Sequence, residues 1–163
     1  MINRRAKLAF PASVCLSFSA APAMAYPTDL PATQASERVT LATLRGNWSF
    51  STDYYRSGLC QMSGNLHVFE QTKPDLAACV LTAVEVCGGE RSVVEQSCEM
   101  SFIDGQVKIV STIEQFIERK PSSLGYLPDN FLLDEVNADE MSGELESAVS
   151  SNAVFRRQEG GIS

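Results

Sequence analysis

The stretch Cys79-Val-Leu-Thr-Ala-Val-Glu-Val-Cys87-Gly-Gly-Glu-Arg-Ser-Val-Val-Glu-Gln-Ser-Cys98 predicts a β-hairpin held together by cysteines. Its first half is rich in Val and Thr, and β-branched side chains favour strands because their restricted rotamers pack well on a pleated sheet. Gly88-Gly89 supplies the positive φ angles of a two-residue turn. That turn places Cys79 opposite Cys98, within disulfide distance. A four-residue turn at 88–91 would instead place Cys98 opposite Leu81, and Cys79 and Cys98 would then be diagonal neighbours on one face.

The first 25 residues predict a secretory signal peptide. Arg4, Arg5 and Lys7 form a basic start, residues 8–18 are mostly apolar, and residues 23–25 form a small-x-small cleavage site. The apolar segment is too short to span a bilayer. The alternative for this segment is a buried N-terminal helix. We therefore expect an exported protein, located in the periplasm or the extracellular space.

Cleavage after residue 25 of 163 leaves 138 residues, which is the size of one domain. Ten basic and all 20 acidic residues remain, so the mature chain carries a net charge of −10. This acidity disfavours nucleic acid and anionic membranes as partners. No later segment is long and apolar enough to span a bilayer. Cys15 leaves with the signal peptide, and the four remaining cysteines predict two disulfides in an oxidising compartment.

Alternating apolar and polar residues predict eight short strands after a short helix. The expected helix spans 36–44, and the expected strands span 46–51, 60–69, 77–87, 90–101, 106–117, 130–136, 141–148 and 152–157. The expected organisation is a tail and short helix over 26–43, one barrel domain over 44–158 and a C-terminal tail over 159–163.

The positions of the turns predict how the cysteines pair. A turn centred on Lys73-Pro74 places Cys60 opposite Cys87, while the Gly88-Gly89 turn places Cys79 opposite Cys98. One strand then offers Cys87 to one neighbour and Cys79 to the other. We therefore expect the disulfides Cys60–Cys87 and Cys79–Cys98. A turn at Asp104-Gly105 joins the next two strands with apolar faces opposed.

Eight antiparallel strands joined mostly by tight turns predict an all-β, up-and-down meander that closes into a small barrel. Closure removes the exposed strand edges that promote aggregation. The interior of an eight-stranded barrel is either filled by side chains or holds one small ligand.

Gly46-Asn47-Trp48 opens the first expected strand, and a two-residue turn at Ser150-Ser151 would aim Arg156 of the last strand inward. This pattern resembles the calycin superfamily of lipocalin-like barrels, in which a Gly-x-Trp tryptophan packs against an arginine of the final strand. The resemblance implies that Gly46, Trp48 and Arg156 close the barrel. In size, export and disulfides the chain is most similar to the small periplasmic inhibitors of bacterial metalloproteases, although those are shorter and have one disulfide.

The sequence offers no catalytic set. His67 is the only histidine, and its parity places it on the polar face of its strand. With four cysteines committed to disulfides, neither a Ser-His-Asp arrangement nor a His/Cys metal site is supported. We expect no enzymatic activity, no cofactor and no metal.

Two groups of polar residues bear on binding. Glu85 and Gln96 share the parity of the inward cysteines, so they are a ligand-binding pair or a hydrogen-bonded core pair, or the strand register is slipped. The acidic clusters near turns, Asp129-Asn130, Asp134-Glu135 and Asp139-Glu140, lack the spacing of a calcium loop, and we expect them to be solvated.

The connections of a meander alternate between two ends, so 52–59, 88–89, 118–129 and 150–151 share one end. The two long ones contain Tyr54, Tyr55, Arg56, Leu124, Tyr126 and Leu127. Tyrosine and arginine are enriched at interface hot spots, so this end is the expected binding surface. The equal alternative is that these aromatic side chains plug the mouth of the barrel.

Two functions fit this pattern. One is a non-catalytic protein that engages or inhibits another exported protein, such as a protease. The other is a lipocalin-like carrier of a small apolar ligand. The lumen of the barrel distinguishes them: a cavity above ~300 Å³ there favours the carrier, whereas a filled core with a protruding tail or mouth favours the protein binder.

Overall fold

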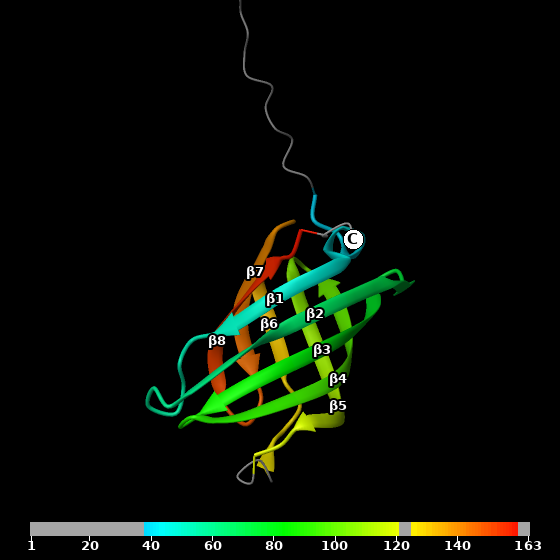
Figure 1. The fold of residues 1–163 in the computed structure, drawn as a ribbon. Coiled ribbons are helices and arrows are strands. Elements are labelled where there is room, and N and C mark those ends of the chain that lie inside the picture. Colours follow the sequence, from blue (N-terminus) through cyan, green and yellow to red (C-terminus); the bar gives the residue numbers. More distant parts are fainter. Residues whose placement is uncertain (1–37, 121–124, 160–163) are drawn as a thin grey trace, which may run out of the picture. The chain divides into compact units, whose positions relative to one another are not determined.

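A computed structural model describes residues 38–120 and 125–159, and within them eight antiparallel strands form a closed barrel in sequential order (Figure 1). The expected signal peptide and Leu124 lie outside the described residues. The elements are a short 3-10 helix η1 (Leu41–Leu44) and the strands β1 (Gly46–Thr52), β2 (Cys60–Lys73), β3 (Leu76–Cys87), β4 (Glu90–Ile103), β5 (Gln106–Glu118), β6 (Asn130–Val136), β7 (Glu140–Glu146) and β8 (Ser150–Arg157).

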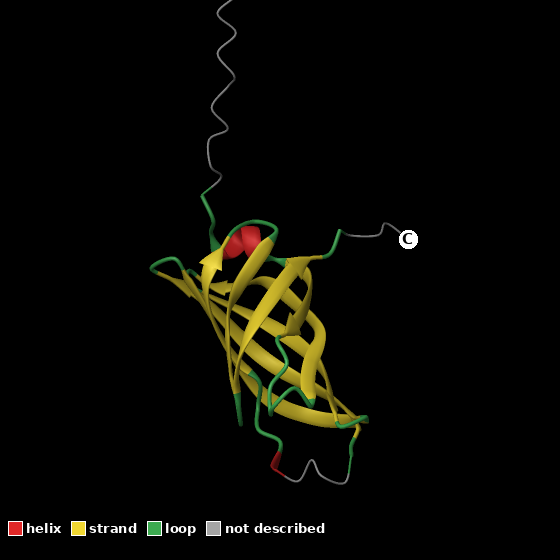
Figure 2. Ribbon diagram, turned by 90° about the vertical axis from the view of Figure 1, so that its left-hand side faces the viewer, coloured by secondary structure: helices red, strands yellow, loops and turns green. Residues whose placement is uncertain are grey.

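The barrel closes where β1 pairs with β8, and Figure 2 shows the strands wrapping around a common axis. The predicted all-β meander is therefore confirmed. Pairing is shortest between β5 and β6, where only 107–109 of β5 meets 131–133 of β6. No helix in the described part of the chain has the length and apolar character needed to cross a membrane.

The helix expected over 36–44 is only one turn in the described residues. The Thr40 side chain accepts a hydrogen bond from the Thr43 backbone and thereby starts η1, and Arg45 is already extended. Residues 36 and 37 lie outside the described range. The prediction was too long because the apolar spacing it used is also met by a single 3-10 turn.

The middle of the barrel is filled by side chains. Phe50 of β1 stacks on Phe155 of β8 with ring centroids 5.0 Å apart, and Phe131 of β6 meets both rings edge-on. Gly64 of β2 makes room for this cluster, since a Cβ there would lie 2.7 Å from the Phe50 ring and 2.0 Å from the Thr82 carbonyl oxygen. The lumen is therefore a packed core.

The two disulfides are those predicted from the strand registers. Cys60 is bonded to Cys87, and Cys79 is bonded to Cys98. The Gly88–Gly89 turn has two residues with positive φ, and Cys79 pairs with Cys98 across it. Together the bonds fasten β3 to both of its neighbours. Two disulfides indicate an oxidising, non-cytoplasmic environment.

The β2–β3 connection differs from the prediction in its turn. Lys73 pairs with Leu76, so Pro74 and Asp75 form the turn in place of Lys73-Pro74. Irregularities between Val68 and Lys73 then shift the register until Cys60 faces Cys87. The predicted pairing was right although the predicted turn was one residue too early.

The arginine that packs on Trp48 is Arg157, and the prediction of Arg156 was wrong. The guanidinium of Arg157 lies 4.3 Å from the centre of the Trp48 ring, whereas Arg156 points outward and pairs with Glu140 at 3.1 Å. The β7–β8 connection is 147–149 and not a two-residue turn at 150–151. Such a shift in the turn exchanges the two faces of the following strand.

Arg157 and Trp48 fix η1 over one end of the barrel. The Arg157 guanidinium donates to the carbonyl oxygens of Thr43, Arg45 and Ala138 at 2.5, 2.8 and 2.6 Å. The Trp48 indole N–H donates to the carbonyl oxygen of Leu44 at 2.9 Å. Gly46 has a φ of 111°, which favours glycine, and brings the backbone close to Arg157. η1 therefore covers this end, and the opposite end carries the long connections.

Candidate functional site

A cavity of about 360 Å³ lies at the end of the barrel opposite η1, and we call it the mouth cavity. All four connections of that end line it, as the alternation of a meander predicts. They contribute Arg56 and Leu59, Gly88, Tyr126 and Leu127, and Ser147 to Val149. Met62 and Glu85 contribute from the inner faces of β2 and β3. The cavity is therefore bounded by connections around its rim and by strand residues below.

The connection between β1 and β2 is held in a defined conformation. Tyr55 and Cys60 exchange backbone hydrogen bonds of 2.9 and 3.2 Å, and Arg56 and Ser57 adopt positive φ angles between them. The Gly88 N–H donates to the carbonyl oxygen of Leu59 at 2.9 Å, which ties this connection to the β3–β4 turn. This arrangement turns the Tyr55 side chain into the barrel.

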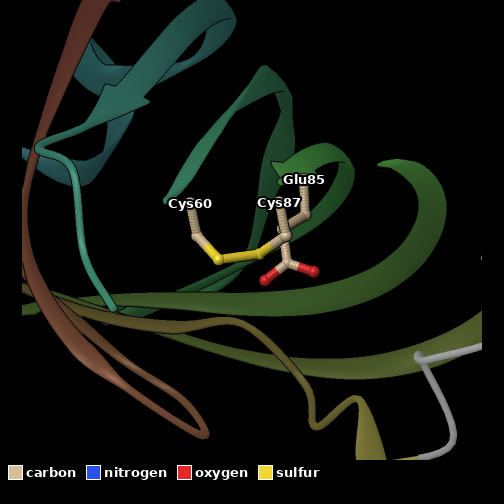
Figure 3. A group of neighbouring side chains, drawn as sticks. All are labelled: Cys60, Glu85 and Cys87. Atoms are coloured by element: carbon tan, nitrogen blue, oxygen red, sulfur yellow. A yellow bond between two sulfur atoms is a disulfide. The ribbon is translucent and has the colours of Figure 1, made fainter. Parts of the chain in front are cut away.

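The Cys60–Cys87 disulfide borders the cavity, and the Glu85 carboxylate lies beside it (Figure 3). The two sulfur atoms and a Glu85 oxygen lie within 4.8 Å of one another. Metals bind cysteine as the thiolate, and both sulfurs are shared in the disulfide. In its oxidised form this group is therefore not a metal site.

Glu85 is 8% exposed and is bonded through both carboxylate oxygens. One oxygen accepts from the Tyr55 hydroxyl at 2.8 Å, and the other pairs with the Lys120 ammonium at 2.8 Å. Burial, together with the hydrogen bond to Glu85, raises the pKa of Tyr55, so its hydroxyl stays protonated and donates. Glu85 and Lys120 thus form a buried ion pair beside the cavity.

Asp129 is the second buried carboxylate of the site and is 1% exposed. Its Oδ2 accepts from the Tyr126 hydroxyl and from the Gln96 side-chain amide, both at 2.6 Å. Its backbone N–H donates to the Gln96 Oε1 at 3.0 Å, and its carbonyl oxygen accepts from the Ser111 hydroxyl at 2.8 Å. The backbone and one carboxylate oxygen of Asp129 are therefore fixed in place.

The other carboxylate oxygen, Asp129 Oδ1, has no hydrogen-bond partner among the described residues. The Ser147 hydroxyl lies close enough to favour the charge, but it donates to the Leu127 carbonyl oxygen. Burial raises the pKa of Asp129 to about 6 and outweighs the hydrogen bonds from Tyr126 and Gln96. A buried, unpartnered carboxylate oxygen is costly and requires an explanation.

The sequence predicted part of this site. Glu85 and Gln96 were expected to point inward, and both are buried. They belong to separate halves of the site, because Glu85 contacts Tyr55 and Lys120 while Gln96 contacts Asp129.

The expectation that Asp129 is solvated was wrong. Its parity matches Phe131 and Leu133, which face the core, and that signal was present in the sequence. Lys120 was missed because it lies in a connection with no periodicity.

The residues proposed from the sequence for binding lie in two different environments. Tyr54 is 68% exposed and Arg56 is also exposed, at the rim. Tyr55 is buried and Tyr126 is half-buried, and both hydroxyls bond to carboxylates below the rim. His67 lies exposed on β2, where its ring contacts Asn47.

No protein-family model matches this chain, and no curated protein matches it. Solved structures do. The chain is similar to a redesigned β-barrel, b11L5F_LGL, with 14% identity and a TM-score of 0.54 over 77% of this chain and all of that one. It is also similar to the redesigned β-barrel mFAP1, bound to DFHBI, with 11% identity and a TM-score of 0.53 over 73% of this chain and 98% of that one. These similarities establish the class of the fold, a small antiparallel β-barrel.

Proposed function

We propose that this protein is an exported, non-catalytic binding protein that holds a small amphipathic molecule in the mouth cavity. The observation that carries the proposal is the mouth cavity of about 360 Å³, which lies within the range of ~300–1,000 Å³ found for small-ligand sites. Apolar side chains and buried charged groups line the same space. The ligand is therefore amphipathic, whereas the sequence had suggested an apolar one.

The filled core determines where the ligand lies. Phe50, Phe131 and Phe155 occupy the middle of the barrel, so the molecule sits at the mouth and does not enter the lumen. Two disulfides support export, as does the basic and apolar pattern of the first 25 residues. The packing of Arg157 on Trp48 supports a relation to the calycins, which we include in the proposal.

Blocking the cavity tests the proposal. We expect a panel of small cationic, neutral and anionic fragments to contain members that bind the wild-type protein in saturation-transfer NMR. Ala148→Trp places a large ring at the rim, where Ala148 is exposed, and should abolish this binding. Ala42→Trp, at an exposed position of η1, is the matched control and should leave binding intact. Absence of fragment binding, or binding unaffected by Ala148→Trp, would rule the proposal out.

A second candidate function is engagement of another exported protein, such as a protease, by the rim. Tyr54, Leu59 and Leu127 are 68%, 66% and 51% exposed there, and large apolar groups on a rim favour contact with a protein. Cross-linking followed by mass spectrometry of co-purified proteins tests this candidate. A specific partner should be captured by the wild type and lost when all three residues are changed to serine. Capture that is equal in both proteins would argue against a rim interface.

A further inference from the structure

We propose that the ligand of the mouth cavity carries a protonated primary amine on a short apolar group, and that the amine binds to Asp129. This inference rests on the proposed function and names its ligand class. It follows from three features of the site: the balance of buried charge, the unpartnered oxygen of Asp129 and the apolar part of the lining.

The buried charge in the mouth is unbalanced. In the described residues the buried charged side chains are Glu85, Lys120 and Asp129. Glu85 and Lys120 neutralise each other in an ion pair of 2.8 Å. Asp129 receives hydrogen bonds from Tyr126 and Gln96, which are both uncharged donors. The excess buried charge is therefore negative and is located on Asp129, so a cationic group is the complementary one.

The unpartnered oxygen specifies what the cation must provide. Asp129 lines the cavity, and its Oδ1 accepts no hydrogen bond from the described residues. A primary ammonium carries a positive charge and three N–H donors, and it forms strong charge-assisted hydrogen bonds with a carboxylate. A hard metal ion is a poorer match because it requires about six oxygen ligands, and most oxygens here already accept hydrogen bonds.

The remaining lining suits an apolar group. Leu59, Met62, Leu127 and Val149 border the cavity, as does the Cys60–Cys87 disulfide. A short alkyl chain or a single ring attached to the amine would be removed from water against these residues.

Binding requires a small movement at the mouth. Asp129 Oδ1 is closed to solvent, whereas Tyr126 is only half-buried and holds the neighbouring Oδ2 through its hydroxyl. An outward rotation of the Tyr126 ring therefore opens the approach to the carboxylate. The ammonium then supplies Asp129 Oδ1 with the hydrogen bond that it lacks.

Isothermal titration calorimetry with three probes of matched shape tests the inference. The probes are hexylammonium, hexanol and hexanoate, added to the mature protein at pH 7.5. We expect hexylammonium to bind more tightly than the other two. Asp129→Asn should weaken hexylammonium about ten- to a hundredfold, the range for loss of a charged hydrogen bond. Glu146→Gln removes the same charge from an exposed position near the mouth and should change the affinity less than twofold.

The pH dependence of the hexylammonium affinity provides a second readout, because a purely structural role of Asp129 would not produce it. The titratable groups that interact with Asp129 are Tyr126, Glu85 and Tyr55, with Lys120 paired to Glu85. Hexylammonium keeps its charge over pH 5–8. The wild-type affinity should fall as the pH drops through about 6, because Asp129 then takes up a proton. The affinity of Asp129→Asn should stay flat over this range.

Each outcome separates the ligand class from the proposed function. Fragments that bind in the cavity while hexanol or hexanoate matches hexylammonium would overturn the amine inference and leave the proposed function standing. Equal hexylammonium affinity in Asp129→Asn and wild type would overturn the role of Asp129. Failure of every fragment and of all three probes would overturn both, and would assign the Asp129 oxygen to solvent.

Discussion

Glu85 and Asp129 are two buried carboxylates at the same mouth, and the protein satisfies them differently. Glu85 has a donor on each oxygen, from Tyr55 and Lys120. Asp129 has two donors on one oxygen and none from the described residues on the other. Local rules of polar satisfaction are broken mainly at functional sites, and this difference is why the proposed ligand contact is placed at Asp129 and not at Glu85.

Asp129 should make the barrel more stable in mild acid. Its pKa is raised from 3.8 to about 6 in the folded protein, so the folded state binds the proton more tightly than the unfolded state. The resulting stability is fully present below about pH 4 and is lost as the pH rises through about 6, and it amounts to about 3 kcal/mol.

Urea denaturation between pH 4 and 7.5 measures this effect. The unfolding free energy of the wild type minus that of Asp129→Asn should fall by about 3 kcal/mol as the pH rises from 4 to 7.5, because Asp129 ionises and the amide does not titrate. Comparison with Asn removes the contributions of the other carboxylates. A difference that is constant, or that grows with pH, would contradict the assigned pKa shift.

Removing one partner of the Lys120–Glu85 ion pair should destabilise the protein, whereas replacing both partners with apolar residues should change its stability little. Lys120→Met leaves Glu85 buried without its cation and should lower the unfolding free energy by about 3–5 kcal/mol. Adding Glu85→Leu removes the stranded charge and should recover most of that loss. Urea melts of the two variants measure both values, and a double variant no more stable than Lys120→Met would disprove a simple ion-pair role.

At the scale of elements, the end of β8 and helix η1 act as one unit. Arg157 bonds three backbone carbonyls and packs on Trp48, whereas the neighbouring Arg156 makes an exposed pair with Glu140. Arg157→Leu should therefore destabilise the barrel by about 3 kcal/mol or more, and Arg156→Leu by about 0–1 kcal/mol. Thermal or urea unfolding compares the two adjacent positions directly. Equal losses would show that the barrel end does not depend on Arg157.

The strands joined by short turns could be predicted from sequence, because the turn residues also set the register. Gly88-Gly89 and Asp104-Gly105 were placed correctly, and they fixed the pairing of β3, β4 and β5. The connection before β8 carries no such signal, and the missed turn exchanged Arg156 for Arg157. Bulges in β2 were also invisible in the sequence pattern.

The site was predicted less completely than the fold. Parity identified Glu85 and Gln96, but it gave no partner for either residue. Asp129 and Lys120 come from the long β5–β6 connection, whose position depends on tertiary contacts such as the bond from Ser111 to the Asp129 carbonyl oxygen. Contacts of this kind join residues far apart in the chain and leave no periodic trace in it.

At the scale of the whole molecule, the two disulfides should contribute similarly to stability and differently to binding. Each closes a loop with a sequence separation of 27 or 19 residues, worth about 3 kcal/mol on the loop-entropy model. The double variant Cys79→Ser/Cys98→Ser should lose this stability and keep fragment binding. Cys60→Ser/Cys87→Ser should lose both, since this bond lines the mouth cavity. Calorimetry and saturation-transfer NMR give the two readouts, and unchanged binding in the second variant would contradict the placement of the ligand.

The most direct test of the central claim, that a small ligand binds in the mouth cavity, is the methionine-methyl NMR spectrum during a titration with a fragment from the panel that binds the wild-type protein. Met62 lines the cavity, while Met100 and Met141 lie in the packed core. The account predicts a saturable shift of the Met62 methyl signal, with the signals of Met100 and Met141 unchanged. A Met62 signal that stays fixed at saturating ligand, or a shift confined to Met100 and Met141, would contradict it.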